Sequence, residues 1–195
     1  MDKTQAHNNL YLISQENDQQ AFKELYGFYF FRLLRFCISI VHAKEPAEEI
    51  VNDVFMNLWR RRSFLHKIEN LDVYLYVAVK NQSLDHLSRN HLKEMVDISA
   101  VSSEYISFTL DPEQLLISAE RASEIEHAVN QLPARCKLIF KMIKEDGLKY
   151  KEVASILNLS IKTVEAQLTI AMKKLTTAIL FASDGKAKQK NTGIR

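Results

Sequence analysis

The sequence predicts an all-α protein built of two small helical domains. Gly and Pro are scarce, with 4 and 3 copies in 195 residues, while hydrophobic residues make up 47% of the chain. That balance is typical of helical proteins with real cores. Apolar residues recur at helical spacing along most of the chain, and Pro46 and Pro133 interrupt the runs. These observations favour helix over strand throughout.

The first expected domain spans residues 1–92. Residues 1–9 are polar and are expected to fray. A helix is expected from Leu10, a second one from around Asp18, and a third one with Pro46 in its first turn. The third helix carries acidic residues at its start and arginines at its end. This pattern complements the helix dipole, so helix stability alone is enough to explain it. The helix also leaves an outward polar face that can dock a partner, made of Asn52, Asp53, Met56, Asn57 and Arg60.

A further helix is expected over residues 73–89, following a loop that ends in a cap at Asp72. Its expected inner residues are Tyr74, Leu75, Val77, Ala78, Leu84 and Leu87. Its expected outer residues are Lys80, Asn81, Asp85, His86, Ser88 and Arg89. Aromatic residues followed by Asn and Arg are compatible with binding unstacked bases and their phosphates. An ordinary amphipathic helix is the alternative interpretation.

A change of composition separates this domain from the second one. Residues 93–112 mix Ser, acids and isolated apolar residues without a sustained period, which predicts a flexible linker. Residues 91–120 hold 1 basic and 6 acidic side chains, a net charge of −5. Residues 121–195 hold 14 basic and 7 acidic side chains, a net charge of +7, which suits a polyanionic partner. The second domain is expected over residues 113–180, followed by a disordered basic tail at 181–195.

Residues 147–175 predict a helix-turn-helix. Ala154 is small enough for two helices to cross closely, and Asn158 tolerates the positive φ of a turn. Ser160 is a candidate N-cap for the second helix, and Gly147 suits a left-handed helix end. The second helix has an apolar stripe at Val164, Leu168, Ala171 and Leu175. Its exposed face carries side chains that can reach phosphates or base edges, namely Lys162, Thr163, Gln167, Lys173 and Lys174. A plain helical hairpin with a solvated polar face is the alternative.

Catalytic and metal-binding patterns are missing from the sequence. Cys37 and Cys136 are far apart within apolar runs, which predicts buried thiols in a reducing compartment. His86 and His91 are five residues apart and do not share a helix face as an i, i+4 pair does. Neither a phosphate-binding Gly loop nor a nucleophile elbow is present. We therefore expect no enzyme, metal, cofactor or small-molecule substrate. No apolar run approaches 18 residues and no signal-peptide pattern opens the chain, so we expect a cytoplasmic protein.

Three stretches together resemble the bacterial RNA polymerase sigma factors of the extracytoplasmic-function (ECF) group. Residues 46–59 (PAEEIVNDVFMNLW) resemble the family's polymerase-binding helix, and residues 74–89 (YLYVAVKNQSLDHLSR) resemble its segment for the minus-10 element. Residues 132–175 contain LPARCKLIF, GLKYKEVASILNLS and TVEAQL in the family's order and spacing. The resemblance covers residues 10–92 and 113–178.

The resemblance implies a sigma factor that binds core RNA polymerase at its clamp and flap and directs promoter-specific initiation. It implies core polymerase binding by Glu49, Asn52, Asp53, Met56, Asn57 and Trp59. It implies minus-10 engagement by Lys80, Asn81, Asp85 and Arg89. It implies minus-35 reading by Ser160, Lys162, Thr163, Gln167, Lys173 and Lys174. The acidic linker is expected to thread the polymerase's RNA channel, and an anti-sigma factor, in some cases membrane-anchored, is an expected partner.

The chain departs from the family pattern within the second helix of the expected reader. Glu165, Ala166, Thr169 and Ile170 occupy a stretch that is frequently more basic in the family. A carboxylate beside phosphates costs affinity unless it accepts a hydrogen bond from cytosine or pairs with a lysine. The alternative function is a one-component helix-turn-helix regulator, which binds a palindromic operator as a dimer without a sigma role.

Overall fold

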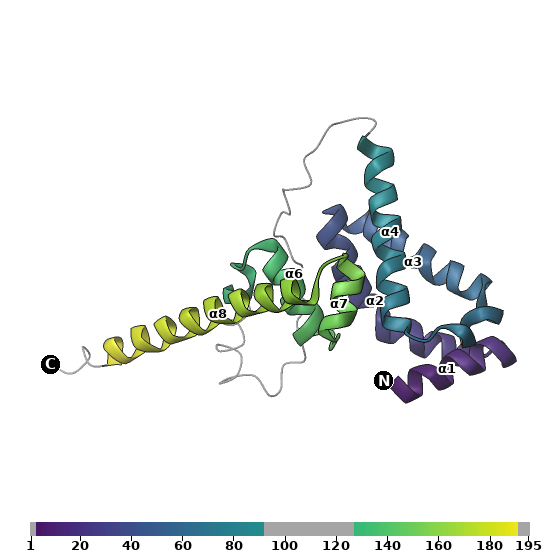
Figure 1. The fold of residues 1–195 in the computed structure, drawn as a ribbon, viewed down its shortest axis with the longest axis horizontal. Helices are drawn as coiled ribbons and strands as arrows, with labels where there is room; N and C mark the ends of the chain where they lie inside the picture. The colour runs from purple at the N-terminus through teal and green to yellow at the C-terminus, as the bar shows by residue number, and fades with distance from the viewer. Residues whose placement is uncertain (1–2, 92–126, 191–195) are drawn as a thin grey trace. The chain divides into compact units, whose positions relative to one another are not determined.

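A computed structural model of the protein describes residues 3–91 and 127–190, and within those ranges it contains helices and no strand (Figure 1). The expected all-α fold is confirmed. The described chain divides into two compact units, one holding α1 to α4 and the other holding α6, α8 and residues 150–154 of α7. The linker at 93–112 and the boundaries at 92 and 113 lie outside the described residues. The division at those positions therefore stays a prediction.

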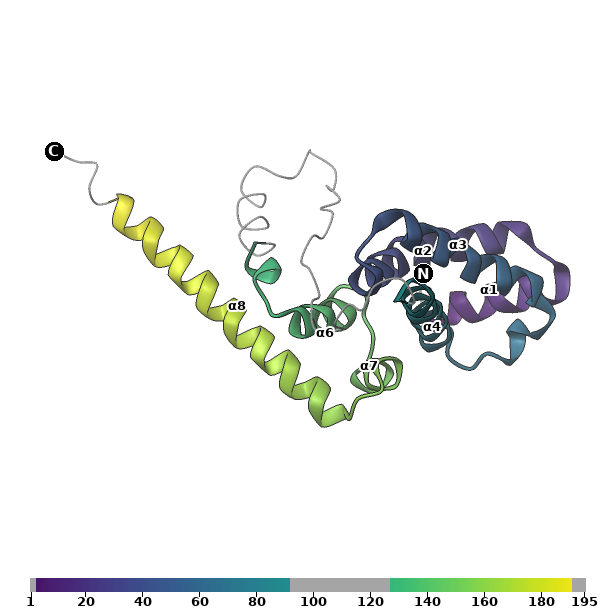
Figure 2. The same cartoon turned by 90° about the horizontal axis from the view of Figure 1, so that it is seen from above.

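The first unit is organised around its second helix. Its elements are α1 (Lys3–Glu16), α2 (Gln19–Val41), α3 (Lys44–Arg60), the short 3₁₀ helix η1 (Arg62–Lys67) and α4 (Leu71–His91). Helix α2 packs against α1, α3 and α4, and α1 also packs against η1; Figure 2 shows this unit from a second side. Leu25, Leu33, Val51 and Leu75 are fully buried between these helices. Burying such side chains stabilises the unit by roughly 1.5–3 kcal/mol each.

Local contacts define the ends of helix α2 in the first unit. Asp18 caps α2, its Oδ1 accepting from the backbone N–H groups of Gln20 at 2.8 Å and Ala21 at 3.1 Å. His42 ends α2 in the left-handed region, with φ of 58°. The expected fraying of residues 1–9 is wrong for the described part, because α1 begins at Lys3 and buries Asn9.

The start and the phase of α4 both differ from expectation. Asn70, and not Asp72, caps the helix, because its Oδ1 accepts from the Val73 N–H at 3.1 Å. The Asp72 carboxylate instead accepts from the Tyr29 hydroxyl at 2.8 Å. Tyr74 and Leu84 were expected inside, yet they are 39% and 45% exposed. The buried side of α4 is rotated away from them and consists of Leu71, Leu75, Tyr76, Val79 and Ser83.

The second unit is built on the packing of α6 (Ala134–Lys144) against α8 (Ile161–Lys190), with α7 (Tyr150–Leu157) between them in the chain. Its core cluster comprises Ala128, Val129, Leu132, Cys136, Ala171 and Leu175, with Phe140 packed against it. Gly147 adopts φ of 73° after α6, as predicted for a left-handed helix end. The chain then turns into α7, whose start is closed by the Glu152 carboxylate accepting from the Lys149 N–H at 2.8 Å.

The last helix is longer than expected. A disordered tail from residue 181 was predicted, but α8 continues to Lys190 and only residues 191–195 lie outside the described chain. The prediction is wrong for residues 181–190. Ala, Lys and Gln in this stretch are good helix formers, and extending an existing helix needs no new nucleus. The single Gly185 costs about 1 kcal/mol, which is too little to stop the helix.

Both cysteines are buried free thiols, as predicted. Among residues 3–91 and 127–190 there is no cluster of three or more metal-ligating side chains. A helix able to span a bilayer is also absent from these ranges.

Candidate nucleic-acid interface

The helix-turn-helix of the second unit has the predicted turn. Asn158 has φ of 54°, and the next N–H, from Leu159, donates to the Ala154 carbonyl at 2.9 Å. The Ser160 hydroxyl accepts from the Thr163 N–H at 3.0 Å and thereby caps α8. The Ser160 and Thr163 hydroxyls also bond to each other at 2.8 Å. These contacts determine the direction in which α8 leaves the turn.

Helix α8 has one side in the core and the opposite side in solvent. Val164, Leu168, Ala171 and Leu175 are buried, as the sequence predicted. At 100° per residue, the opposite side carries Lys162, Ala166, Thr169, Ile170 and Lys173, and Glu165 lies at its edge, about 90° from the middle of the buried stripe; all six are exposed. This outward side of α8, defined by those six residues, is the surface that a recognition helix presents to a major groove.

The structure divides the predicted minus-35 residues between two sides of α8. Lys162 and Lys173 lie on the outward side. Gln167 is half-buried toward α6, and its Oε1 accepts from the Cys136 thiol at 3.0 Å. Lys174 lies close enough to Cys136 for its charge to lower the pKa of that thiol, against the larger upward effect of burial. Ser160 and Thr163 are occupied in the cap, so the predicted set does not form a single surface.

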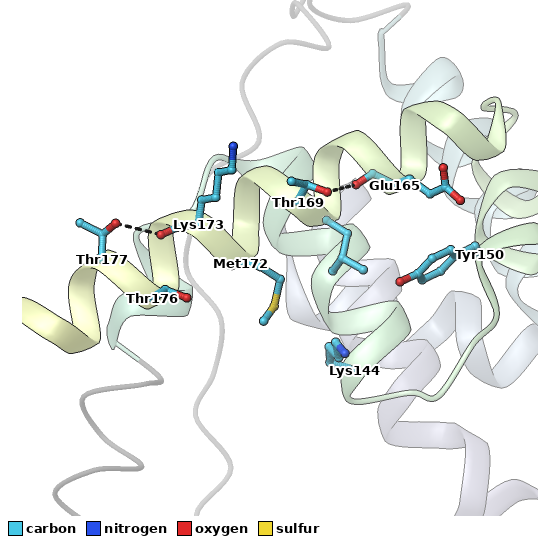
Figure 3. A pocket seen from close by; sticks show the side chains of 9 residues that line it. Lys144, Tyr150, Glu165, Thr169, Met172, Lys173, Thr176 and Thr177 are labelled. Atoms are coloured by element: carbon cyan, nitrogen blue, oxygen red, sulfur yellow. Dashed lines mark hydrogen bonds between the residues drawn. The ribbon is translucent and has the colours of Figure 1, made fainter.

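A groove of about 730 Å³ runs beside α8 in the second unit (Figure 3). Its lining residues are Lys144, Tyr150, Glu165, Leu168, Thr169, Met172, Lys173, Thr176 and Thr177. Tyr150 at the start of α7 is 39% exposed and lies on the same side of α8 as Glu165. In a helix-turn-helix the first helix crosses the DNA backbone, so a tyrosine at its start can reach a phosphate. Sequence reasoning missed Tyr150, because it stands before the apolar positions that define the helix-turn-helix pattern.

Helix α3 separates its buried and exposed residues as the sequence suggested. Ile50, Val51, Val54, Phe55 and Leu58 are buried. Five of the six predicted polymerase-binding residues are exposed, namely Glu49, Asn52, Asp53, Met56 and Asn57. Met56 is 50% exposed, an apolar side chain amid polar neighbours. The Tyr26 hydroxyl donates to Asn52 Oδ1 at 3.0 Å, which connects α2 to the edge of this face.

Trp59 does not share the exposed position of those five residues. It is half-buried, with its ring centroid 4.9 Å from that of Phe22. The Arg62 guanidinium lies over the indole, 4.9 Å from its centroid, and also donates to the Trp59 carbonyl at 3.2 Å. Arg62 further bonds to Asn17 in the turn between α1 and α2. Trp59 therefore joins the end of α3 to α2 and η1.

Helix α4 brings most of its predicted residues together. Asn81, Asp85 and Arg89 are exposed at four-residue spacing, which aligns them on one side. Tyr74 lies one heptad before Asn81 and is exposed on that side as well. Lys80 is half-buried and is rotated by about 100° from Asn81. The structure thus adds an aromatic side chain to this surface and sets Lys80 apart from it.

Comparison with known proteins finds a match for each of the two units. Residues 25–92 match the family described as sigma-70 region 2, and residues 122–175 match sigma-70, region 4. The RNA polymerase sigma-H factor of Pseudomonas aeruginosa is 20% identical over 172 residues, covering 85% of this chain and 89% of that protein. The ECF RNA polymerase sigma-E factor of Escherichia coli K12 is 21% identical over 175 residues, covering 85% and 90%. The chain belongs to the ECF group of sigma factors.

Solved sigma-factor structures share its fold. One is a sigma factor, RpoE, in complex with the anti-sigma factor NepR from Bartonella quintana, with a TM-score of 0.56 and 20% identity over 81% of this chain and 96% of that one. Another is CnrH in complex with the cytosolic domain of CnrY, with a TM-score of 0.50 and 18% identity over 93% and 97%.

As a sigma factor, the protein binds core RNA polymerase and promoter DNA and directs promoter-specific transcription. The family consists of non-catalytic regulators of transcription. The one-component regulator is not favoured, because residues 25–92 match a sigma-specific region.

Proposed function

We propose that this sigma factor divides its work among the exposed sides of three helices, each of which has its other side in a core. The observation that carries the proposal is the clean separation of buried and exposed residues on α3, α4 and α8. A side chain that packs in the core cannot also reach a partner, so the exposed positions are the ones available for binding.

The outward side of α3 is the proposed polymerase contact. It presents two carboxylates and two amides around the exposed Met56. An unbranched, adaptable apolar side chain ringed by polar groups is typical of a protein-binding surface. Trp59 is removed from the proposed contact set, because its ring is engaged by Phe22 and Arg62.

The exposed side of α4 is the proposed minus-10 surface. Tyr74 supplies a ring on which an unstacked base can lie, and Arg89 supplies a cation for the backbone. Asn81 and Asp85 lie between them and can bond to base edges. The outward side of α8, together with Tyr150, is the proposed minus-35 surface, with Lys162 and Lys173 binding phosphates.

The remaining assignments follow from the resemblance. We propose region boundaries at 1–92 and 113–180, with the acidic residues 93–112 threading the polymerase. Two relatives of known structure are named as complexes with an anti-sigma factor or with a partner's cytosolic domain. We propose that an anti-sigma factor also binds this chain, and that it acts where the polymerase is, in the cytoplasm.

A reconstitution experiment tests the proposal. The purified chain is mixed with core RNA polymerase, run on size exclusion and then used to transcribe a genomic promoter library. Co-elution with new promoter-specific transcripts is expected for the wild-type chain.

The Asp53→Ala, Met56→Ala double variant is expected to stay helical and to lose co-elution. The matched double variant Lys44→Ala, Glu48→Ala removes a surface ion pair at the start of α3 and is expected to keep co-elution. Retained assembly by the first variant contradicts the α3 assignment. Tight duplex binding by the chain alone, without co-elution, points instead to a one-component regulator.

A further inference from the structure

The outward side of α8 has an unusual distribution of charge for a surface that meets DNA. Lys162 and Lys173 stand at its two ends, eleven residues or about 16 Å apart along the helix. Between them lie Glu165, Ala166, Thr169 and Ile170, none of which is basic. The cations at the ends can bind phosphates, so the four central side chains are left to meet base edges.

Glu165 is the only carboxylate on this surface. Its side chain is exposed, and within the described part of the chain no hydrogen bond or ion pair engages its carboxylate. Its backbone carbonyl accepts from the Thr169 hydroxyl at 2.8 Å, a contact that leaves the carboxylate available. A negative charge here repels the DNA phosphates unless it receives a hydrogen bond from a base.

Base chemistry selects the partner of such a carboxylate. In the major groove the amino group at N4 of cytosine is the donor that Glu or Asp accepts from. Ala166 and the 42%-exposed Ile170 are the apolar residues of the outward side, about 100° and 140° around the helix from Glu165. Apolar side chains in the major groove contact the methyl group of thymine.

We propose that Glu165 is a specificity-determining residue that reads a cytosine in the minus-35 element, with thymine at a neighbouring pair read by Ala166 and Ile170. The inference rests on the proposed role of α8. It adds the base that the helix selects. The outward side carries only two lysines. Compared with a more basic recognition helix, it therefore gains less binding affinity from phosphates, and a larger part of its affinity depends on base contacts.

The test uses holoenzyme assembled from core polymerase and the full chain. A promoter recovered from the genomic library is rebuilt with its minus-35 element randomised, and the templates of the resulting transcripts are sequenced. Wild-type holoenzyme is expected to prefer a C·G pair at one position by about tenfold to a hundredfold. Glu165→Gln is expected to lose that preference and to move toward adenine, which Gln reads, with the other positions unchanged.

Glu145→Gln is the matched control, because it removes an exposed carboxylate of the same unit that is paired with Lys141 at the end of α6. Its sequence preference is expected to equal that of the wild type. The inference is overturned if Glu165→Gln leaves the preference unchanged, or if it raises transcription equally from all templates. Absence of promoter-specific transcription by the wild-type holoenzyme overturns the proposed function as well, so the two failures are distinguishable.

Discussion

Replacing Trp59 with alanine is expected to weaken the folded state of the first unit and not the polymerase contact itself. The Phe22 ring and the Arg62 guanidinium each lie 4.9 Å from the indole. An aromatic pair contributes about 0.5–1.5 kcal/mol beyond its buried area, and a cation–π contact at a partly exposed site about 0.5–1 kcal/mol. Adding the lost apolar contact of a half-buried ring, we expect the free energy of unfolding to fall by about 2 kcal/mol.

Urea denaturation followed by circular dichroism measures this loss. Tryptophan fluorescence cannot follow the unfolding of this variant, because Trp59 is the only tryptophan in the chain and the substitution removes it. With a urea m-value of about 2 kcal/mol/M, the midpoint of the transition is expected to fall by about 1 M. Met56→Ala is the matched comparison on the same helix. It is expected to leave the midpoint almost unchanged, because Met56 is 50% exposed, and to weaken core polymerase binding. An unchanged midpoint for Trp59→Ala combined with lost polymerase binding would refute the reasoning and return Trp59 to the contact surface.

Three further outcomes are expected. Gly147→Ala introduces a side chain at φ of 73° and is expected to lower the stability of the second unit by about 1 kcal/mol, seen as a lower urea midpoint. Gly27→Ala, in the exposed middle of α2, is expected to raise the urea midpoint of the first unit. Lys173→Ala is expected to reduce by about 1 the slope of log affinity against log salt for holoenzyme on promoter DNA, and Lys174→Ala to reduce it less; the reverse order contradicts the outward side defined above. Burial raises the pKa of the Cys37 thiol from 9.0 to about 11, so the folded state keeps this proton to higher pH than the unfolded state. Stability is then complete below about pH 9 and falls as the pH rises toward 11, and Cys37→Ala is expected to remove that part of the decline in urea midpoint.

Features decided by neighbouring residues were predictable from the sequence. The helix start near Asp18, Asn158 in the turn, Ser160 before α8 and Gly147 after α6 all depend on contacts within a few residues. Capping groups and positive-φ positions have strong residue preferences, so one residue type carries the information. The apolar stripe of α8 was predictable for a similar reason, since its period matches a single buried side.

Features decided by packing between distant segments were not predictable. Helix α4 has apolar residues on most of its circumference, so its pattern does not say which side faces α2. That ambiguity placed Tyr74 and Leu84 inside, although both are exposed. Gln167 looked available for DNA, but its partner Cys136 comes from 31 residues earlier in the chain. Trp59 was assigned to polymerase from its place in a motif, and only its contact with Phe22 reveals a packing role.

The separation of buried and outward residues on α3 has a consequence for the evolution of this protein. Substitutions at positions such as Met56 leave the buried contacts of Val51 and Phe55 intact, so the amount of folded protein in the cell stays the same. A change of about 1.4 kcal/mol at the outward side alters the affinity for polymerase tenfold. By mass action, this changes the fraction of core RNA polymerase that binds this sigma factor when another subunit competes for the same binding surface. Single substitutions on the outward side of α3 can therefore change how well this factor competes for polymerase, by neutral change or by selection, while the stability of the fold is kept.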